Sequence, residues 1–385
     1  MLLNIYLKEI KDCFRDQRTL LLTVLLPIVM MTGLTLFYEK LVSDGGDDTY
    51  KLAVDTSFGT DEANLFEAYK NIELVKSINP EKTVQDGDAQ AALLLSPGFI
   101  HNIEHANEAS VTLIGDSFSQ NSANLMNIVT NALSNYEMSV ISDRLQAQEI
   151  DSALIEPFTI HQKEMSEENP NINLIAMLIP MMLALAIGIG AGPAASDLFA
   201  GEKEKKTMEA LLMTPVKRST LLLSKWLTIS TIGAITGIIT LVVVALEITF
   251  LTENLKKAVS FGDNAYLVIS LAILVSIIYA MFIASLLMVT SIIGKTIKES
   301  QSYSTPILMV AVFPTLFTST IGINELSYQH FVIPILNIFS LLKELIFGII
   351  NYEHIMLTIG SNLICMILFF IIGRIMFMKD KWVMN

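Results

Sequence analysis

Charged residues are scarce in this chain of 385 residues: Asp, Glu, Lys and Arg make up 16% of it, against about a quarter in soluble proteins. Hydrophobic residues make up 52%, a composition that argues against an ordinary soluble enzyme. Only two cysteines occur, Cys13 and Cys365, and their separation predicts no disulfide framework. The G-x-x-x-x-G-K-[ST] motif is also missing, because the Gly-Lys-Thr tripeptide at 294–296 has Val289 where the first glycine belongs. We therefore expect no ATP to bind this chain in that way.

The net charge of −13 is unevenly distributed. Residues 39–172 contain 23 acidic and seven basic residues, a net charge of −16, which leaves +3 for the rest of the chain. The sequence thus consists of an acidic, soluble insert within an apolar, mildly basic body. An acidic surface repels phosphate, so nucleic acid is not expected as a partner.

Long apolar runs fill the body. Five of them have the roughly 20 apolar residues that cross a bilayer, namely 19–38, 174–195, 221–250, 266–293 and 354–378. A sixth, 304–321, is shorter and carries Pro306 and Pro314, and we interpret it as a kinked span. The segment 331–350 is also apolar but contains Lys343 and Glu344, which could pair with each other or with neighbours.

Lysine and arginine gather in four clusters between these runs. The clusters are Lys8, Lys11, Arg15 and Arg18; Lys203, Lys205, Lys206, Lys217 and Arg218; Lys295 and Lys298; and Arg374, Lys379 and Lys381. Short basic loops stay in the cytoplasm, so all four are expected inside. Six spans satisfy this rule, whereas a seventh through 331–350 would place the tail 379–385 outside. We therefore predict a re-entrant hairpin at 331–350 on the outer side, cytoplasmic termini, and an extracytoplasmic domain at 39–172.

The predicted fold is a polytopic α-helical membrane protein with an α/β domain inserted between spans 1 and 2. Residues 1–18 show helical periodicity with charges on the opposite face, which predicts an interfacial amphipathic helix. A cleaved signal peptide is disfavoured, since this segment is long and contains acidic residues. In the insert, strands are expected at 50–57, 72–78, 91–96, 110–117 and 158–165, and helices at 61–70, 97–106 and 121–150. Cys13 is interpreted as an ordinary interfacial thiol, with lipidation as the alternative.

One motif in the insert has the spacing of a metal site. His101, Glu104 and His105 match the H-x-x-E-H pattern of inverted zinc peptidases. The pattern is short and no further acidic ligand is identifiable, so a solvated helix face is the favoured interpretation. His161 is likewise interpreted as a surface residue of a strand. No catalytic residue, resident metal or cofactor is predicted.

The segment 196–218 is a cytoplasmic connection with dense mixed charge. Apolar residues at 208, 211 and 212 follow at helical spacing, which predicts a helix with a narrow apolar edge suited to a groove on a partner. On composition alone, a solvated loop with ordinary cytoplasmic lysines is the favoured interpretation of this segment.

The string GEKEKKTMEALLMTPV at 201–216 resembles the segment after the second span in permeases of the ABC type-2 exporter class. The N-terminal helix, the large outer domain and the segment 334–347 resemble that class too, so the resemblance covers nearly the whole chain. In that family the 201–216 region lies beside the helix that contacts the ATPase subunit. The implied contact residues are Glu202, Lys203, Glu204, Lys205, Lys206, Thr207, Glu209 and Leu212.

The resemblance implies a half-transporter in the bacterial cell membrane, with two copies of this chain in membrane lipid and two copies of a separate subunit that binds ATP and Mg²⁺. Within the class the likeness is to sodium-extruding transporters, which implies sodium as the substrate. A sodium ion needs oxygen ligands. The candidates for a cation path are Glu247, Ser304, Thr305, Thr318 and Asn337. For Glu247, the alternative is a side chain that reaches the outer interface.

Three other functions stay open at this stage. The same machine could export an amphiphile such as a peptide, drug or lipid, which the scarcity of buried carboxylates favours. A membrane-anchored sensor would need fewer spans than the six predicted. A zinc peptidase on the outer face rests on the short histidine motif alone.

Overall fold

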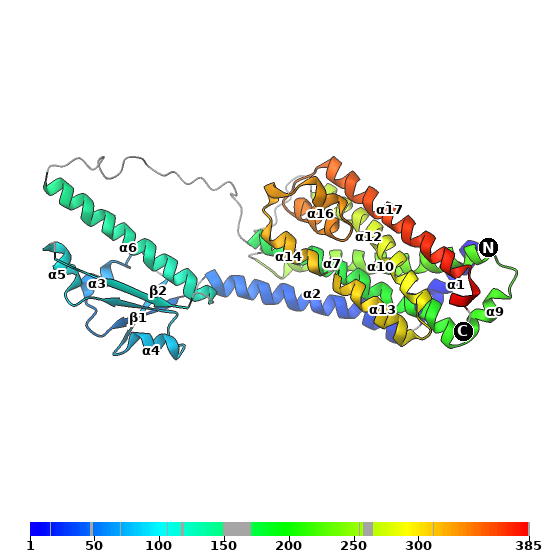
Figure 1. Ribbon diagram of the computed structural model, residues 1–385, viewed down its shortest axis with the longest axis horizontal. Helices are drawn as coiled ribbons and strands as arrows, with labels where there is room; N and C mark the ends of the chain where they lie inside the picture. The colour runs from blue at the N-terminus through cyan, green and yellow to red at the C-terminus, as the bar shows by residue number, and fades with distance from the viewer. Residues whose placement is uncertain are drawn as a thin grey trace. The chain divides into compact units, whose positions relative to one another are not determined.

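The computed structural model describes residues 1–15, 17–46, 49–69, 71–105, 107–116, 119–148, 171–253, 255–256, 265–310 and 312–383. The chain divides into two compact units, Ser43–Ser166 and the combination of Met1–Val42 with Glu167–Asn385 (Figure 1). The strand expected at 158–165, with His161, lies outside the described residues. We call the two parts the α/β unit and the helical unit.

The α/β unit contains a four-stranded sheet in the order β2-β1-β3-β4. The strands are β1 (Tyr50–Asp55), β2 (Ile72–Ser77), β3 (Ala91–Leu95) and β4 (Val111–Gly115). β1 pairs in parallel with β2 and β3, whereas β4 runs antiparallel to β3. Four of the five expected strands are therefore confirmed.

Four helices accompany the sheet. They are α3 (Thr60–Asn64), α4 (Pro80–Gln85), α5 (Phe99–Glu104) and α6 (Gln120–Ala147). Successive strand residues point to opposite faces, so Leu52 packs against Leu125 of α6 in one core and Ala53 packs near Val84 of α4 in another. The helix α4 was not expected from the sequence. It begins after Asn79, whose side chain accepts a hydrogen bond from the Lys82 amide and caps the helix.

The helical unit contains the remaining elements. The first and longest helices are α1 (Leu2–Arg15), α2 (Gln17–Gly46), α7 (Asn171–Ser196), α10 (Arg218–Phe250), α12 (Ala265–Ile293) and α17 (Tyr352–Phe377). Shorter ones are η2 (Asp197–Gly201, a π-helix), α8 (Glu202–Glu204), α9 (Thr207–Leu212), α13 (Ile297–Val310), α14 (Phe313–Thr320), η4 (Ile323–Glu325), α15 (Tyr328–Val332), α16 (Leu336–Ile346) and α18 (Asp380–Val383).

Four helical stretches are long and apolar enough to cross a membrane: Ile175–Glu204, Arg218–Phe250, Ala265–Ile293 and Tyr352–Phe377. A shorter apolar stretch, Leu25–Phe37, lies within α2. Large apolar side chains are exposed along these helices, for example Val29 at 58% and Ile364 at 67%. Such a surface is typical of a protein that faces lipid.

The segment expected as a kinked fifth span consists of two helices, α13 and α14, and α13 begins at Ile297, seven residues before the expected start. The Glu299 amide bonds the Thr296 hydroxyl and the Lys295 amide bonds the Glu299 carboxylate, which fixes this helix start. The Gly-Lys-Thr tripeptide thus forms the short connection between α12 and α13. At 331–350, α15 and α16 meet at Ile335, whose φ of 74° is strained for a β-branched residue.

Glycines let α7 and α10 pack closely. A Cβ at Gly190 would overlap Thr236, and one at Gly237 would lie 2.9 Å from Ile187. Gly190 and Gly237 therefore serve helix packing, as small residues do in membrane helices, whereas a Cβ at Gly192 would meet open space.

Candidate functional site

The segment after the second long helix is held in place by its own backbone. α7 passes into the π-helix η2, then into α8, and Lys206, with a φ of 59°, turns the chain into α9. The Thr207 hydroxyl donates to the Glu202 carbonyl at 3.2 Å across this turn. π-Helical turns occur frequently at functional sites.

Two of the residues expected to contact a partner point inward instead. Lys203 is 5% exposed, and its ammonium donates to the carbonyls of Ile292 at 2.7 Å and Trp382 at 3.2 Å. Glu202 accepts a hydrogen bond from Lys225 at 2.6 Å. These two side chains therefore fix the segment to the body of the helical unit.

Lys225 is the centre of a buried ionic cluster. Its side chain is fully buried, and its ammonium lies 2.6 Å from Glu202, 3.7 Å from Glu9 and 2.9 Å from the Leu198 carbonyl. Glu9 is 3% exposed and belongs to α1. We call Glu9, Glu202 and Lys225 the Lys225 cluster. It joins α1, α8 and α10, which lie far apart in the sequence.

The other predicted contact residues face outward. Glu204, Lys205, Lys206, Thr207 and Glu209 are exposed and Leu212 is half-buried. Met208 is 1% exposed and anchors α9 in the core.

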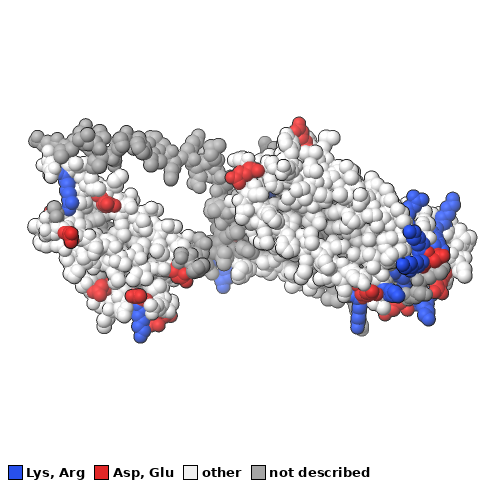
Figure 2. Space-filling view, in the orientation of Figure 1, with Lys and Arg blue, Asp and Glu red and all other residues white. Residues whose placement is uncertain are grey.

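Two contacts define the charge of this outer face. The Glu204 carboxylate accepts from the Ile297 amide at 2.9 Å, which joins α8 to the start of α13. Lys205 pairs with Asp197 at 2.9 Å, and this hydrogen bond raises the pKa of Lys205. Charged side chains gather at this end of the helical unit, where the C-terminus and α9 also lie (Figures 1 and 2).

The comparisons with known proteins agree with this architecture. Residues 3–382 match the family described as ABC-2 family transporter protein. The chain belongs to this permease family. It is 37% identical over 385 residues, the whole of both chains, to the ABC transporter permease protein NatB of Bacillus subtilis (strain 168). No solved structure matches.

In this ABC-2 permease, the five residues predicted for a cation path make separate contacts. Ser304 bonds Thr290 at 2.9 Å, Thr305 donates to the Gln301 carbonyl, Thr318 donates to the Pro314 carbonyl, and Asn337 accepts from Asn362 at 3.3 Å. Within the described part of the chain, no hydrogen bond joins two of the five.

Glu247 is the candidate with the most distinctive surroundings. It is 5% exposed and accepts a hydrogen bond from the Thr32 hydroxyl of α2, so it does not extend to the surface. Its Oε2 atom is buried without a hydrogen-bond partner among the described residues. A cavity of about 30 Å³ is lined by residues that neighbour Thr32 and Glu247 in the sequence, among them Thr35, Val244 and Ile248. A buried carboxylate oxygen without a donor is able to accept a cation.

The hairpin carries a second set of buried polar groups. Lys343 donates to the carbonyls of Thr318 at 2.8 Å and Ile321 at 2.6 Å. Glu344 accepts from His354 at 2.8 Å, and the His354 ring stacks on Phe331 at 3.8 Å. Lys343 and Glu344 thus pair with neighbours rather than with each other.

Sequence reasoning missed the Lys225 cluster and His354. Glu9 and Lys225 are 216 positions apart, so no local pattern connects them. One signal was available, because Lys225 is a charged residue inside the apolar run 221–250.

Proposed function

We propose that this chain is the permease of an ATP-driven exporter that extrudes sodium ions from a bacterial cell. A separate subunit binds ATP and Mg²⁺ and hydrolyses the nucleotide, and two copies of each chain form the transporter. The observation that carries the proposal is full-length similarity to a permease named NatB, together with an outward-facing charged segment at 204–212.

The proposed topology has six spans, with α13 and α14 forming the fifth, and cytoplasmic termini. Contacts between the basic clusters support it. Arg218 pairs with Asp380 at 2.8 Å and donates to the Met378 carbonyl, while Lys203 donates to Trp382. The second of the four clusters predicted to be inside is thus bonded to the segment that carries the fourth, at one end of the helical unit. The α/β unit is then extracytoplasmic.

The ATPase subunit is proposed to dock on the exposed side of α8 and α9. Glu204, Lys205, Lys206, Thr207 and Glu209 offer charges and hydrogen-bond donors, and Leu212 offers an apolar edge. In this proposal Glu202 and Lys203 do not contact the ATPase subunit. They hold the docking surface in place through hydrogen bonds to α10 and α12.

For the docking surface, the test is the charge reversal Lys206→Glu with Glu209→Lys. We expect loss of ATP-dependent transport with normal insertion, because both side chains are exposed and make no contact with the core. Lys298→Glu, an exposed charge reversal outside the segment, is the matched control. Wild-type transport in the double variant would remove this surface from the docking site.

For the substrate, the test is sodium uptake into inside-out vesicles that contain both subunits. We expect uptake that requires hydrolysable ATP, and Glu247→Gln should reduce it, because the uncharged amide binds a cation more weakly. Glu253→Gln, an exposed change in the same part of the chain, should leave uptake unchanged. ATPase activity that ignores sodium, with no ion flux, would contradict the sodium proposal.

One observation favours export of an amphiphile instead. An apolar groove of about 590 Å³ lies among α7, α10, α12 and α16, with Thr249 and Lys256 as polar lining residues. A groove of this volume suits a drug-sized ligand. Ala272→Trp would narrow it. This second function would be established if the parent protein transported a fluorescent amphiphile but no sodium, and if Ala272→Trp lost that transport.

A further inference from the structure

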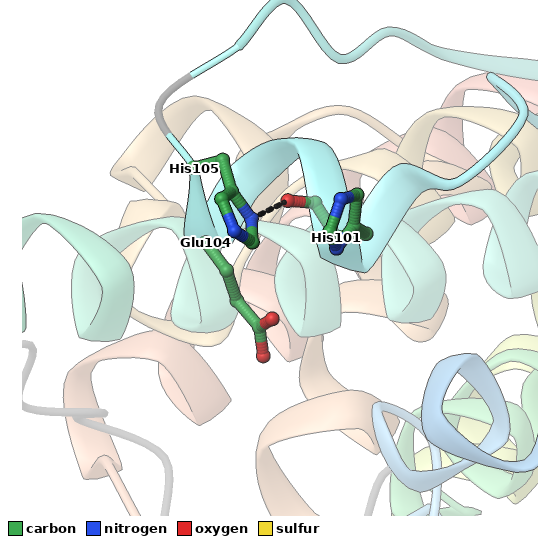
Figure 3. A group of neighbouring side chains, drawn as sticks. All are labelled: His101, Glu104 and His105. Atoms are coloured by element: carbon green, nitrogen blue, oxygen red, sulfur yellow. Dashed lines mark hydrogen bonds between the residues drawn. The ribbon is translucent and has the colours of Figure 1, made fainter.

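The helix α5 of the α/β unit brings three ligand side chains together at its C-terminal end. One ligand atom from each of His101, Glu104 and His105 lies within 4.8 Å of the other two (Figure 3). All three side chains are exposed. Residues three and four positions apart lie on one face of a helix, which is why this spacing recurs in helical zinc sites.

The backbone that carries these side chains is anchored at both ends. Phe99, at the start of α5, is 5% exposed, and the preceding Gly98 has a φ of 66° that starts the helix. At the other end, the Arg144 guanidinium of α6 donates to the Ile103 carbonyl. The site therefore rests on a short helix fixed to a longer one, although its side chains face solvent.

One histidine is already oriented as a ligand. The His105 ring has its Nδ1 atom 2.9 Å from the His101 carbonyl oxygen, and a carbonyl only accepts, so the proton is on Nδ1 (Figure 3). In the neutral ring the lone pair is then on Nε2. Metal-bound histidines commonly donate their second ring nitrogen to a backbone carbonyl in this way, which fixes both tautomer and orientation.

The chemical types of the three ligand atoms indicate which metal ion the site would bind. Two imidazole nitrogens and one carboxylate oxygen suit zinc and its neighbours, whereas sodium, magnesium and calcium prefer oxygen alone. Zinc bonds to these atoms are about 2.0–2.2 Å long, so small side-chain rotations would bring the three atoms to one ion. The ring centroids of His101 and His105 are already 4.1 Å apart.

We propose that His101, Glu104 and His105 form a binding site for a divalent ion of the zinc class on the α/β unit. Water completes the coordination, because the site is open to solvent. Glu104 acts as a ligand here, and the proposal includes no peptidase activity. The site is independent of the transported substrate, so its test does not depend on sodium export.

The test is a titration of the full-length permease, purified with a tag that lacks histidine, with Zn²⁺ by calorimetry and with Co²⁺ by visible absorption. We expect one saturable site per chain. His101→Gln is the cleanest variant, because the His101 side chain makes no hydrogen bond among the described residues. It should weaken binding by more than about tenfold, since loss of even an outer-shell partner costs that much.

Further variants separate the three ligands from the background. His105→Gln should weaken binding as His101→Gln does, and Glu104→Gln should weaken it less, because the amide keeps one oxygen. The matched controls are Glu108→Gln, at an exposed residue, and His330→Gln, at a half-buried one, and both lie outside the cluster. Absence of a saturable site in the wild-type protein, or wild-type affinity in His101→Gln, would overturn the proposal.

Discussion

Among the described residues, the helical unit buries three lysines, Lys203, Lys225 and Lys343, and the last two are neutralised in different ways. Lys225 is paired with two carboxylates, Glu202 at 2.6 Å and Glu9 at 3.7 Å. Lys343 meets the carbonyls of Thr318 and Ile321, at the end of α14, where the helix dipole is negative. The Lys225 cluster thus joins three chain segments through full charges, whereas Lys343 caps one helix through partial charges.

This difference separates the two sites in function as well. An ionic cluster that includes Glu202 lies directly behind the proposed docking surface and links it to α1 and α10. A lysine that caps α14 holds α16 against that helix. We infer that Lys225 serves coupling and that Lys343 serves the structure of the hairpin.

The largest effect is expected from Lys225→Met. The variant leaves Glu202 without its cation and Glu9 with only the exposed Lys8 at 3.5 Å, and breaking a buried pair costs about 3–5 kcal/mol. The thermal midpoint of unfolding in detergent should fall accordingly. Adding Glu9→Gln and Glu202→Gln removes the orphaned charges and should restore much of the loss. A Lys225→Met protein as stable as wild type would show that the cluster does not hold the segment.

Lys343→Met should cost less, about 1–3 kcal/mol, because it leaves two carbonyls without donors but strands no opposite charge. The same unfolding measurement checks this, with the exposed Lys298→Met as control. A loss of stability as large as that of Lys225→Met would show that the two lysines stabilise the protein equally, despite their different partners.

The smallest effect on stability is expected at an exposed ion pair between α10 and α18. Arg218 and Asp380 form an ion pair at 2.8 Å, but their side chains are 30% and 65% exposed. Water screens such a pair, so Asp380→Asn should cost less than about 1 kcal/mol and the cost should vanish in high salt. A loss above that of Lys343→Met would mean that the C-terminal contact is structural.

The sequence predicts the local features of this permease well. Alternation in the insert locates β1 to β4, and hydropathy locates α7, α10, α12 and α17, because both depend on neighbouring residues. The helix α13 begins seven residues before the predicted span 304–321, because Thr296 and Glu299 cap a polar first turn that hydropathy does not detect. The positive φ of Ile335 depends on tertiary packing, and no residue type there indicates it.

The candidate site was predicted only in outline. Mixed charge indicated the segment 196–218, yet composition could not distinguish Lys203, which is buried, from Lys205, which is exposed. That distinction depends on the Ile292 and Trp382 carbonyls, which come from distant parts of the chain. The H-x-x-E-H spacing, by contrast, is local, and the structure brings its three side chains together.

Cys13 provides a way to measure the electrostatics of the Lys225 cluster without unfolding the protein. Burial, followed by the negative charges of Glu9 and Asp197, raises the pKa of the Cys13 thiol to about 12, while Lys225 opposes the rise. At pH 8 only about one thiol in ten thousand is then ionised, and the thiolate is the reactive form. In a Cys365→Ser background, Cys13 should therefore react slowly with a maleimide.

Removal of a neighbouring negative charge stabilises the thiolate, so Glu9→Gln and Asp197→Asn should each lower the pKa of Cys13 and speed alkylation. Asp197 is exposed, which makes Asp197→Asn the variant least able to act by loosening the core. The rate should be followed against pH, because a pKa change shifts the profile along the pH axis, whereas better access raises the rate at every pH. A profile raised without a shift would mean that Cys13 reports on opening of α1 and not on the charges around Lys225.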